Sequence, residues 1–334
     1  MHHRNIFKLQ KAALIMSKKV SIIIPCISIN DQCIKCIRKC LALDYLDFEI
    51  IVLPDFCNKR SKDDRLRIIE TGKVKPAFKR NKGMEIAEGS FFAFIDDDAY
   101  PMRDWLKNAM KYFDDEKIGL VGGPNLTPPE GNFAEHISGH VLSSFMVMGP
   151  ASIRYKVAEN QTAWELPSCN YISRNLGIKY DNSFLTAEDT KYCFDVWNKG
   201  YKVFYAGDVR VNHHRRDRIS KHVKQIYLYG RDVAWLTKKE FSFDKLYYMI
   251  PTLGLLGFIL GLLGIYYRIY SNLILVAFII YFILMALSSL KKNIFTSLFV
   301  LGISVVTHFA QAFGWLKGIF TRPEKSAEVK WNSR

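Results

Sequence analysis

Short apolar runs alternate with amphipathic stretches along the first two thirds of the chain. The runs at 20–25, 48–53 and 91–95 are apolar at almost every position, which is typical of strands buried on both faces of a sheet. Further strands are predicted at 66–70, 118–121, 202–205 and 209–212, and helices at 31–43, 80–88, 105–113, 188–199 and 219–237. This alternation predicts an α/β fold with a mostly parallel central sheet, helices on both faces and right-handed crossovers.

The last third of the chain has a different pattern. No acidic residue occurs from 246 to 320, and two stretches, 246–267 and 269–290, approach the roughly 20 apolar residues that a membrane span requires. We predict a transmembrane helix for each. A third stretch, 294–316, is long enough but contains His308 and Gln311, so we predict that it either spans the membrane or lies in its interface.

Basic residues flank these segments unevenly. Lys238, Lys239 and Lys245 precede the first segment, and Lys291 and Lys292 follow the second. By the positive-inside rule, this bias predicts a multi-pass protein of the inner (cell) membrane whose N-terminal domain is cytoplasmic. The predicted organisation is a basic extension (1–19), an α/β domain (20–240), a membrane domain (241–320) and a basic tail (321–334).

The overall charge agrees with a membrane location. Lys and Arg number 47 against 32 Asp and Glu, a net charge of +15. Such a balance suits an anionic partner: nucleic acid, phospholipid head groups or a nucleotide. The long acid-free apolar region decides for membrane lipids, and no nucleic acid is expected.

The seven cysteines fit a reducing compartment. Cys33, Cys36 and Cys40 share one face of a predicted helix at the spacing of core residues. No second Cys pair or His pair follows. The spacing therefore favours packing over a zinc or iron–sulfur site.

The clearest candidate chemistry is a run of three acids, Asp96, Asp97 and Asp98, directly after the strand at 91–95. Adjacent carboxylates repel one another unless a cation lies among them. Oxygen ligands suit Mg²⁺ or Mn²⁺, and the carboxyl ends of strands are where α/β sheets bind ligands. The run predicts a metal–diphosphate site, and the alternative is a strand–turn with solvated acids.

Six short motifs follow one another in order. They are Ser21-Ile-Ile-Ile-Pro25, Glu49-Ile-Ile-Val-Leu-Pro-Asp55, Lys79-Arg-Asn-Lys-Gly83, Phe94-Ile-Asp-Asp-Asp98, Ala187-Glu-Asp189 and Val211-Asn-His-His-Arg215. In this order and spacing, the chain resembles a family 2 glycosyltransferase with a GT-A nucleotide-sugar fold, over about residues 20–235. The resemblance implies transfer of a sugar from a nucleotide-diphosphate donor, with inversion and with Mg²⁺ or Mn²⁺.

The resemblance also implies roles for donor-binding residues. Asp55 matches the acid that recognises the nucleotide base, although Pro54 replaces a first acid that the family often has. Arg80 and Asn81 match the Arg-Asn pair that precedes the metal strand. Asp98 would bind the metal, and Asp96 would hold the ribose or metal waters. The donor-binding set that the resemblance implies is Pro25, Asp55, Arg80, Asn81, Asp96, Asp97, Asn170 and Arg215.

Two further implications concern catalysis and the metal. Asp189 matches the family's general base, which removes a proton from the acceptor hydroxyl. His213 matches a histidine that completes the metal or diphosphate site, so the implied metal ligands are Asp98, Asp96 and His213. The expected acceptor is a membrane-associated, lipid-linked saccharide in the synthesis of a surface glycan.

Two alternatives remain at this stage. Polyprenyl phosphate could itself be the acceptor, and since a phosphate is already a nucleophile, Asp189 would then be unnecessary. A non-catalytic membrane- or lipid-binding protein would explain the basic charge but not the six ordered motifs.

Overall fold

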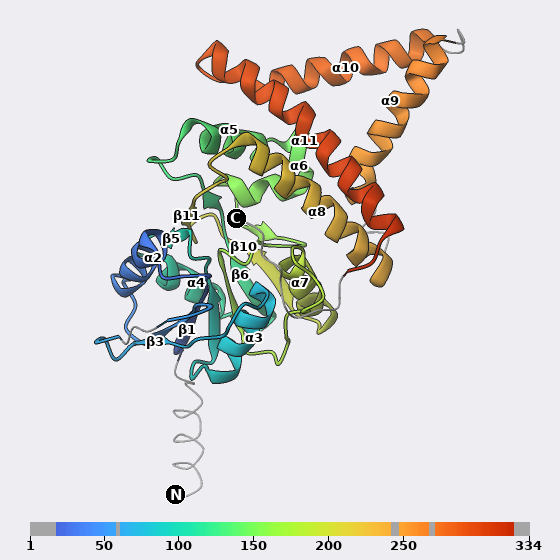
Figure 1. The fold of residues 1–334 in the computed structure, drawn as a ribbon. Helices are drawn as coiled ribbons and strands as arrows, with labels where there is room; N and C mark the ends of the chain where they lie inside the picture. The colour runs from blue at the N-terminus through green and yellow to red at the C-terminus, as the bar shows by residue number, and fades with distance from the viewer. Residues whose placement is uncertain (1–17, 58–60, 242–246, 267–270, 324–334) are drawn as a thin grey trace, which may run out of the picture.

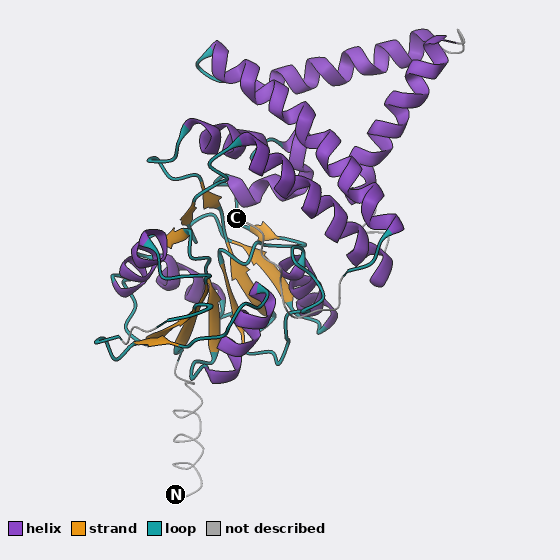
Figure 2. Cartoon of the chain, in the orientation of Figure 1, coloured by secondary structure: helices purple, strands orange, loops and turns teal. Residues whose placement is uncertain are grey.

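The computed structural model describes residues 18–57, 61–241, 247–266 and 271–323. Most of the predicted extension (1–19) and tail (321–334) lies outside these residues. An α/β domain contains all the strands, and three long C-terminal helices project from it (Figures 1 and 2).

The α/β domain is built on an eight-stranded sheet of order β3-β2-β1-β4-β9-β6-β10-β8. The first four strands of this order are parallel, and β9 then runs antiparallel between β4 and β6. The mostly parallel sheet of the prediction is confirmed, but β9 was not predicted. The strands are β1 (Val20–Pro25), β2 (Phe48–Leu53), β3 (Leu66–Ile68), β4 (Phe91–Phe94), β6 (Ile118–Gly122), β8 (Gln161–Thr162), β9 (Tyr171–Arg174) and β10 (Lys202–Tyr205).

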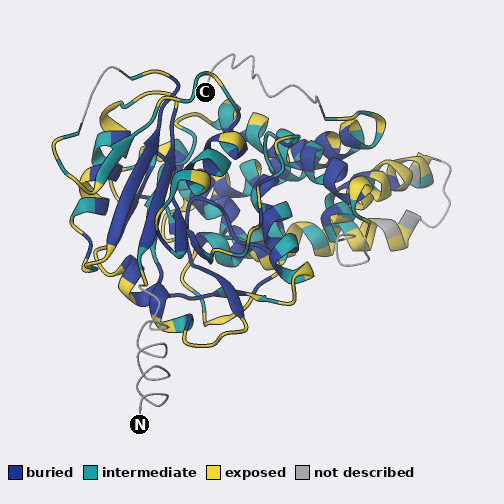
Figure 3. Ribbon diagram, turned by 90° about the horizontal axis from the view of Figure 1, so that it is seen from below, coloured by how far each residue is buried: buried dark blue, intermediate teal, exposed yellow. Residues whose placement is uncertain are grey.

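Successive residues of β1 serve two different cores. Ile22 and Ile24 pack in a cluster with the cysteines of α2 (Asp31–Leu41) and with Trp105 of α4 (Trp105–Tyr112). Ile23 packs on the opposite face, in a cluster that includes α7 (Glu188–Asn198). The central strands are buried throughout (Figure 3). Covering both faces of the sheet is what makes these strands apolar at every position.

The helix before β4 begins earlier than predicted. It is α3 (Pro76–Ile86), whereas the prediction was 80–88. Pro76 occupies the first turn, where a missing N–H is harmless and the fixed φ favours a helix. The shift places Lys79 and Arg80 in the buried interior of the helix.

A second, three-stranded sheet has the order β5-β11-β7. Its strands are β5 (Ala99–Pro101), β7 (Asn125–Leu126) and β11 (Val211–His213). In the antiparallel pair of β5 and β11, His213 lies opposite Ala99, the residue that follows Asp98. This pairing brings the end of the last strand to the acids after β4.

The C-terminal helices extend the molecule away from the sheet. In Figure 1, α9 (Ile250–Tyr266), α10 (Ser271–Ser289) and α11 (Ile294–Phe320) form an open triangle, and α11 returns to pack along α8 (Ile219–Lys239). Between the sheet and these helices lie α5 (Phe133–Leu142), α6 (Phe145–Met148) and the 3₁₀ helix η1 (Gly149–Tyr155).

Two helical segments among the described residues, Tyr247–Gly264 and Ile294–Phe320, are long and apolar enough to cross a membrane. Many of the large apolar side chains of α9, α10 and α11 are exposed. In the second predicted span, the apolar helical segment is Leu275–Ser289, which is shorter than these two segments. These helices suggest membrane association, and the number of spans and the cytoplasmic orientation stay predictions.

Glycines allow α8 and α11 to approach closely. A Cβ on Gly314 would overlap the carbonyl oxygen of Tyr227, and one on Gly318 would overlap that of Arg231. Gly230 of α8 faces the backbone of Gln311 in the same way. The overlapped atoms belong to the backbone of the facing helix and cannot move aside as a flexible side chain could. Any side chain at these positions must therefore separate the two helices.

We therefore expect Gly314→Ala to lower the thermal midpoint of the detergent-solubilised protein. Overpacking of this kind costs about 1–3 kcal/mol, more than the roughly 1 kcal/mol by which alanine favours a helix over glycine. Gly302→Ala is the matched control, because a Cβ there meets nothing within 4 Å on the same helix. Equal midpoints for the two variants would contradict the close α8–α11 contact.

Candidate active site

The acids after β4 meet partners from three other elements. Asp96 accepts a hydrogen bond from Arg80 of α3 at 2.8 Å, and a second nitrogen of Arg80 donates to Glu188 of α7, also at 2.8 Å. Asp98 lies 3.1 Å from Nε2 of His213 on β11. Asp97 is buried beside them. The ends of β4 and β11 and two helices thus converge on one site.

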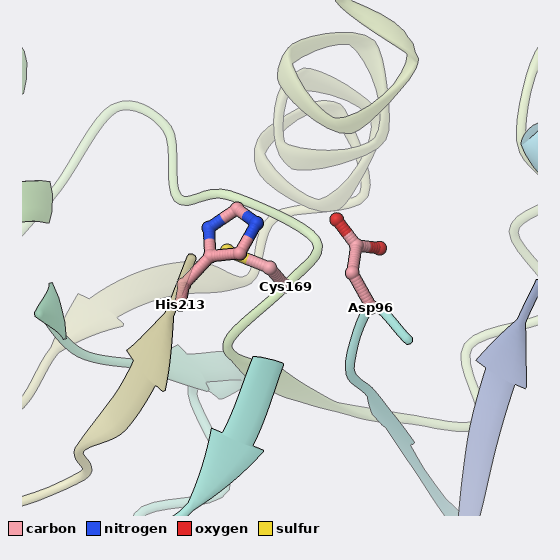
Figure 4. A group of neighbouring side chains, drawn as sticks. All are labelled: Asp96, Cys169 and His213. Atoms are coloured by element: carbon pink, nitrogen blue, oxygen red, sulfur yellow. The ribbon is translucent and has the colours of Figure 1, made fainter. Parts of the chain in front are cut away.

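A group of possible metal ligands lies at this point. Ligand atoms of Asp96, Cys169 and His213 all lie within 4.8 Å of one another (Figure 4). In Figure 4, Cys169 lies beside the ring of His213, and Asp96 faces them from the end of its strand. Carboxylate and imidazole ligands fit Mn²⁺ or Mg²⁺, whereas the thiol of Cys169 prefers softer ions.

The ring of His213 is held on both nitrogens. Nε2 lies against Asp98, and Nδ1 is 3.3 Å from the guanidinium of Arg215. Burial lowers the pKa of His213, but Cys169 and Asp98 more than offset this, so that the pKa rises to about 10. Asp98 beside the ring thus favours its protonated, positively charged form.

Glu188 and Asp189 begin α7 on a constrained turn. Ala187, directly before them, has φ +66° and is the one non-glycine residue with positive φ in the described parts of the chain. Such a conformation is costly for an L-residue, and it is typical of functional turns. Burial, with a further contribution from Asp189, raises the pKa of Glu188 to about 7, although Arg80 opposes the rise.

Asp189 is held by three groups. The backbone N–H groups of Thr190 and Ser168 donate to its carboxylate at 2.8 and 3.4 Å, and Arg154 lies 3.9 Å away. Burial raises the pKa of Asp189, and Arg154 partly offsets this. A carboxylate with a raised pKa is a stronger base than an ordinary aspartate, so its position is suited to proton transfer.

One cavity of about 1710 Å³ joins these groups. Its polar part is lined by Arg80, the three acids, Asp189 and His213. Its apolar part reaches α6 and the C-terminal helices, at residues such as Phe145, Phe258, Phe278 and Phe282. The predicted metal ligands and the predicted base therefore face a common space that continues between the projecting helices.

The amino-acid sequence of this domain matches a known family. The family model for glycosyl transferase family 2 matches residues 21–179. The chain contains a domain of this family. It is a glycosyltransferase with a GT-A-type α/β domain, as the resemblance of the six motifs implied.

The curated relatives of this glycosyltransferase are remote in sequence. A dolichyl N-acetyl-alpha-D-glucosaminyl phosphate 3-beta-D-2,3-diacetamido-2,3-dideoxy-beta-D-glucuronosyltransferase of Methanococcus voltae is 24% identical over 267 residues, which cover 74% of this chain and 80% of the relative. The UDP-Glc:alpha-D-GlcNAc-diphosphoundecaprenol beta-1,3-glucosyltransferase WfaP of Escherichia coli is 25% identical over 199 residues, which cover 52% of this chain and 76% of the relative.

A solved structure supports the fold. The mannosyltransferase PcManGT from Pyrobaculum calidifontis, in complex with GDP-Man and Mn²⁺, superposes with a TM-score of 0.54 at 12% identity. The match covers 90% of this glycosyltransferase and 87% of that chain. At this identity the likeness concerns the fold alone.

The predicted donor residues fall into different environments in the glycosyltransferase. Pro25 and Asp55 line a small separate pocket, where Lys79 forms an ion pair with Asp55. Arg215 donates to Asn125 and lies over the ring of Tyr155 at 4.9 Å, at the wall of the large cavity.

Asn81 and Asn170 have structural contacts instead. Asn81 accepts from the backbone N–H of Tyr180 and donates to its carbonyl oxygen at 2.7 and 2.8 Å. Asn170 is fully buried. Its side-chain amide accepts a hydrogen bond from Trp105 and donates to the carbonyl oxygens of Pro124 and Val209. Neither side chain is among those that line the large cavity, so the structure gives no support to the donor contacts predicted for them.

The sequence reasoning missed a buried ionic network beside Asp189. Glu165 accepts hydrogen bonds from Arg154 (2.9 Å), Thr190 (2.6 Å), Tyr247 (3.1 Å) and Tyr248 (2.7 Å). Tyr247 and Tyr248 lie within three residues of the start of α9, so the first projecting helix is tied to the surroundings of Asp189. No local signal marks Arg154, which lies in an irregular region of the sequence.

Proposed function

We propose that this glycosyltransferase moves a sugar from a nucleotide-diphosphate donor to a hydroxyl of a lipid-linked saccharide, with inversion at the anomeric carbon. The observation that carries the proposal is the shared cavity. Asp96, Asp98, His213 and Asp189 all line it, and it continues into an apolar region lined by the C-terminal helices. The names of the relatives from Methanococcus voltae and Escherichia coli, which include lipid-phosphate acceptors, support this acceptor class.

The cation in this proposal is Mn²⁺ or Mg²⁺, held by Asp98, Asp96 and His213. When bound, it supplies positive charge that stabilises the departing nucleotide diphosphate. The neutral form of His213 is the form that ligates. Arg80 restrains Asp96 from the side of α3 and so keeps this carboxylate oriented toward the site.

Asp189 acts as the general base in the proposal. The acceptor hydroxyl oxygen forms a bond to the anomeric carbon, the bond from that carbon to the diphosphate breaks, and the hydroxyl proton passes to Asp189. A single base is sufficient for one displacement with inversion. A retaining route would need a nucleophilic carboxylate in addition.

The proposed setting is the membrane surface. The transferase domain would lie on the cytoplasmic side of the inner membrane, with α9, α10 and α11 in contact with lipid. Their exposed apolar side chains support this location, and the basic residues that flank them support the orientation.

The direct test is a screen of the purified full chain against a panel of nucleotide sugars with Mn²⁺, Mg²⁺ or a chelator. We expect metal-dependent donor hydrolysis with one donor, and transfer when a lipid-linked saccharide is added. Transfer to polyprenyl phosphate alone, with no transfer to a hydroxyl, would overturn the proposed acceptor. Hydrolysis that is insensitive to the chelator would overturn the proposed metal site.

Glu165→Gln is expected to change the pH dependence of transfer. The negative charge of Glu165 contributes to the raised pKa of Asp189. Its removal should lower that pKa, so the acid limb of the pH–rate profile should move to lower pH. The buried Arg154 also loses its balancing charge, and we expect a lower thermal midpoint, since breaking a buried ion pair typically costs about 3–5 kcal/mol.

The matched control is Glu240→Gln, which removes an acid that forms an ion pair with Lys191 at 2.8 Å. Its acid limb should stay at the wild-type position. A Glu165→Gln protein with a lower midpoint but an unmoved acid limb would limit Glu165 to a structural role.

A further inference from the structure

Three basic side chains line the large cavity beyond the metal site. They are Arg215 and Arg216, directly after β11, and Lys224, on the second turn of α8. Arg154 and Lys221 also line the cavity, but each forms an ion pair, Arg154 with Glu165 and Lys221 with Asp217, both at 2.9 Å. Among the described residues, none of the first three has a carboxylate within ion-pair distance. A cavity wall with uncompensated cations favours an anionic ligand.

Arg215 and Arg216 differ in how they are held. Arg215 is fixed by Asn125, the ring of Tyr155 and His213, close to the predicted metal ligands. Arg216 and Lys224 have no hydrogen bond to any of the described side chains. They are therefore available to a ligand that enters from outside the metal site.

Arg216, Lys224 and Asp189 line the same cavity. The hydroxyl of Tyr229 accepts a hydrogen bond from Gln225 at 2.8 Å, and burial raises the pKa of this phenol. Arg216 opposes that rise and Asp189 adds to it, so both charged groups act on one phenol. Tyr229 itself lines the cavity, so Arg216 lies near Asp189 within it.

The same cavity has an apolar part. Phe258, Phe278, Phe282 and Phe309, from the three projecting helices, line it. The three acids, Asp189, the two cations and these phenylalanines therefore line one continuous cavity. A lipid-linked saccharide combines the corresponding groups: hydroxyl and sugar, phosphate, hydrocarbon chain.

We propose that Arg216 and Lys224 bind the phosphate or diphosphate of the lipid-linked acceptor, while its hydrocarbon chain occupies the space between α6, α9, α10 and α11. This inference rests on the proposed function and adds the acceptor site to it. The phosphate anchors the acceptor, and the attached sugar reaches Asp189. Arg215, nearer the metal ligands, stays assigned to the donor diphosphate.

The test compares binding of four probes to the full chain in detergent by calorimetry: farnesyl diphosphate, farnesol, and UDP or GDP with Mn²⁺. A hydrogen bond to a charged group contributes enough for each lost cation to weaken binding by roughly tenfold or more. We therefore expect the Arg216→Gln/Lys224→Gln variant to lose at least about tenfold in affinity for farnesyl diphosphate. Affinity for farnesol and for the nucleotide should stay within about twofold, a change well below 1 kcal/mol.

Lys39→Gln is the matched control, because Lys39 is exposed on α2 and does not line the cavity. Its affinities should equal those of the wild type. A loss of nucleotide affinity equal to that for farnesyl diphosphate would assign the two cations to the donor and overturn the inference. An equal loss for farnesol, no loss at all, or no binding of farnesyl diphosphate to the wild type would also overturn it. Metal-dependent donor hydrolysis, measured in the same variant, tests the proposed function separately.

Discussion

Asp98→Asn is expected to abolish sugar transfer while the protein stays folded. The amide has the same shape as the carboxylate but removes one negative charge from the site shared with Asp96 and His213. Weaker binding of the cation removes charge stabilisation from the departing diphosphate, which amounts to several kcal/mol, or roughly 10²–10³-fold in rate. The measurement is initial rate at saturating Mn²⁺, together with calorimetric titration of Mn²⁺ in the presence of nucleotide.

Asp44→Asn separates this effect from a general effect of charge. Asp44 is exposed and forms an ion pair with Lys107 at 2.7 Å. It is not among the residues that line the cavity. Its rate and Mn²⁺ affinity should match the wild type. Full activity of Asp98→Asn, or equal Mn²⁺ affinity in the variant and the wild type, would remove Asp98 from the metal site.

The parallel half of the sheet could be predicted from the sequence because its strands are buried on both faces. Val20–Pro25 and Phe48–Leu53 have the predicted bounds, and burial of every residue explains their continuous apolar runs. Strand β9 (Tyr171–Arg174) was missed for the opposite reason. It has four residues, ends in a polar Ser-Arg pair and follows an irregular segment, so neither its period nor its direction is visible in the sequence.

Some features that were missed did leave a signal. Asn132 and Glu135 form a capping box at the start of α5, with both reciprocal hydrogen bonds present. Pro76 after Lys75 marks the start of α3. Local chemistry specifies both helix starts, so a closer examination of the sequence would have found them.

The residues around the site were predictable only in part. The acids after β4 and His213 come from strand ends, where the geometry of a sheet brings side chains together, and the structure does bring them together. Cys169 and Glu165 come from irregular segments and Arg154 from a short 3₁₀ helix, so their positions depend on tertiary packing. Asn81 could be matched to a motif, but the motif does not reveal its contacts. The oxygen and the nitrogen of its side-chain amide both form hydrogen bonds with the backbone of Tyr180.

Asp189→Asn is expected to lower the rate of transfer by roughly 10²–10⁴-fold, the usual contribution of general base catalysis. Donor affinity should change far less, because the predicted donor and metal residues lie on other elements. The wild-type rate should fall as pH decreases through the pKa of Asp189, since the base must be ionised. Burial raises that pKa, so this acid limb should lie at higher pH than for an exposed aspartate.

The control is an Asp-to-Asn substitution further along α7, at Asp195. Asp195 forms an ion pair with Lys191 at 2.5 Å and does not line the cavity, so Asp195→Asn should retain the wild-type rate. The wild-type product should have the anomeric configuration opposite to that of the donor. A near-normal rate of Asp189→Asn on a hydroxyl acceptor would show that another group takes the proton. Since Glu188 is engaged by Arg80 and has a pKa near 7, Glu188→Gln would then be the next variant to measure.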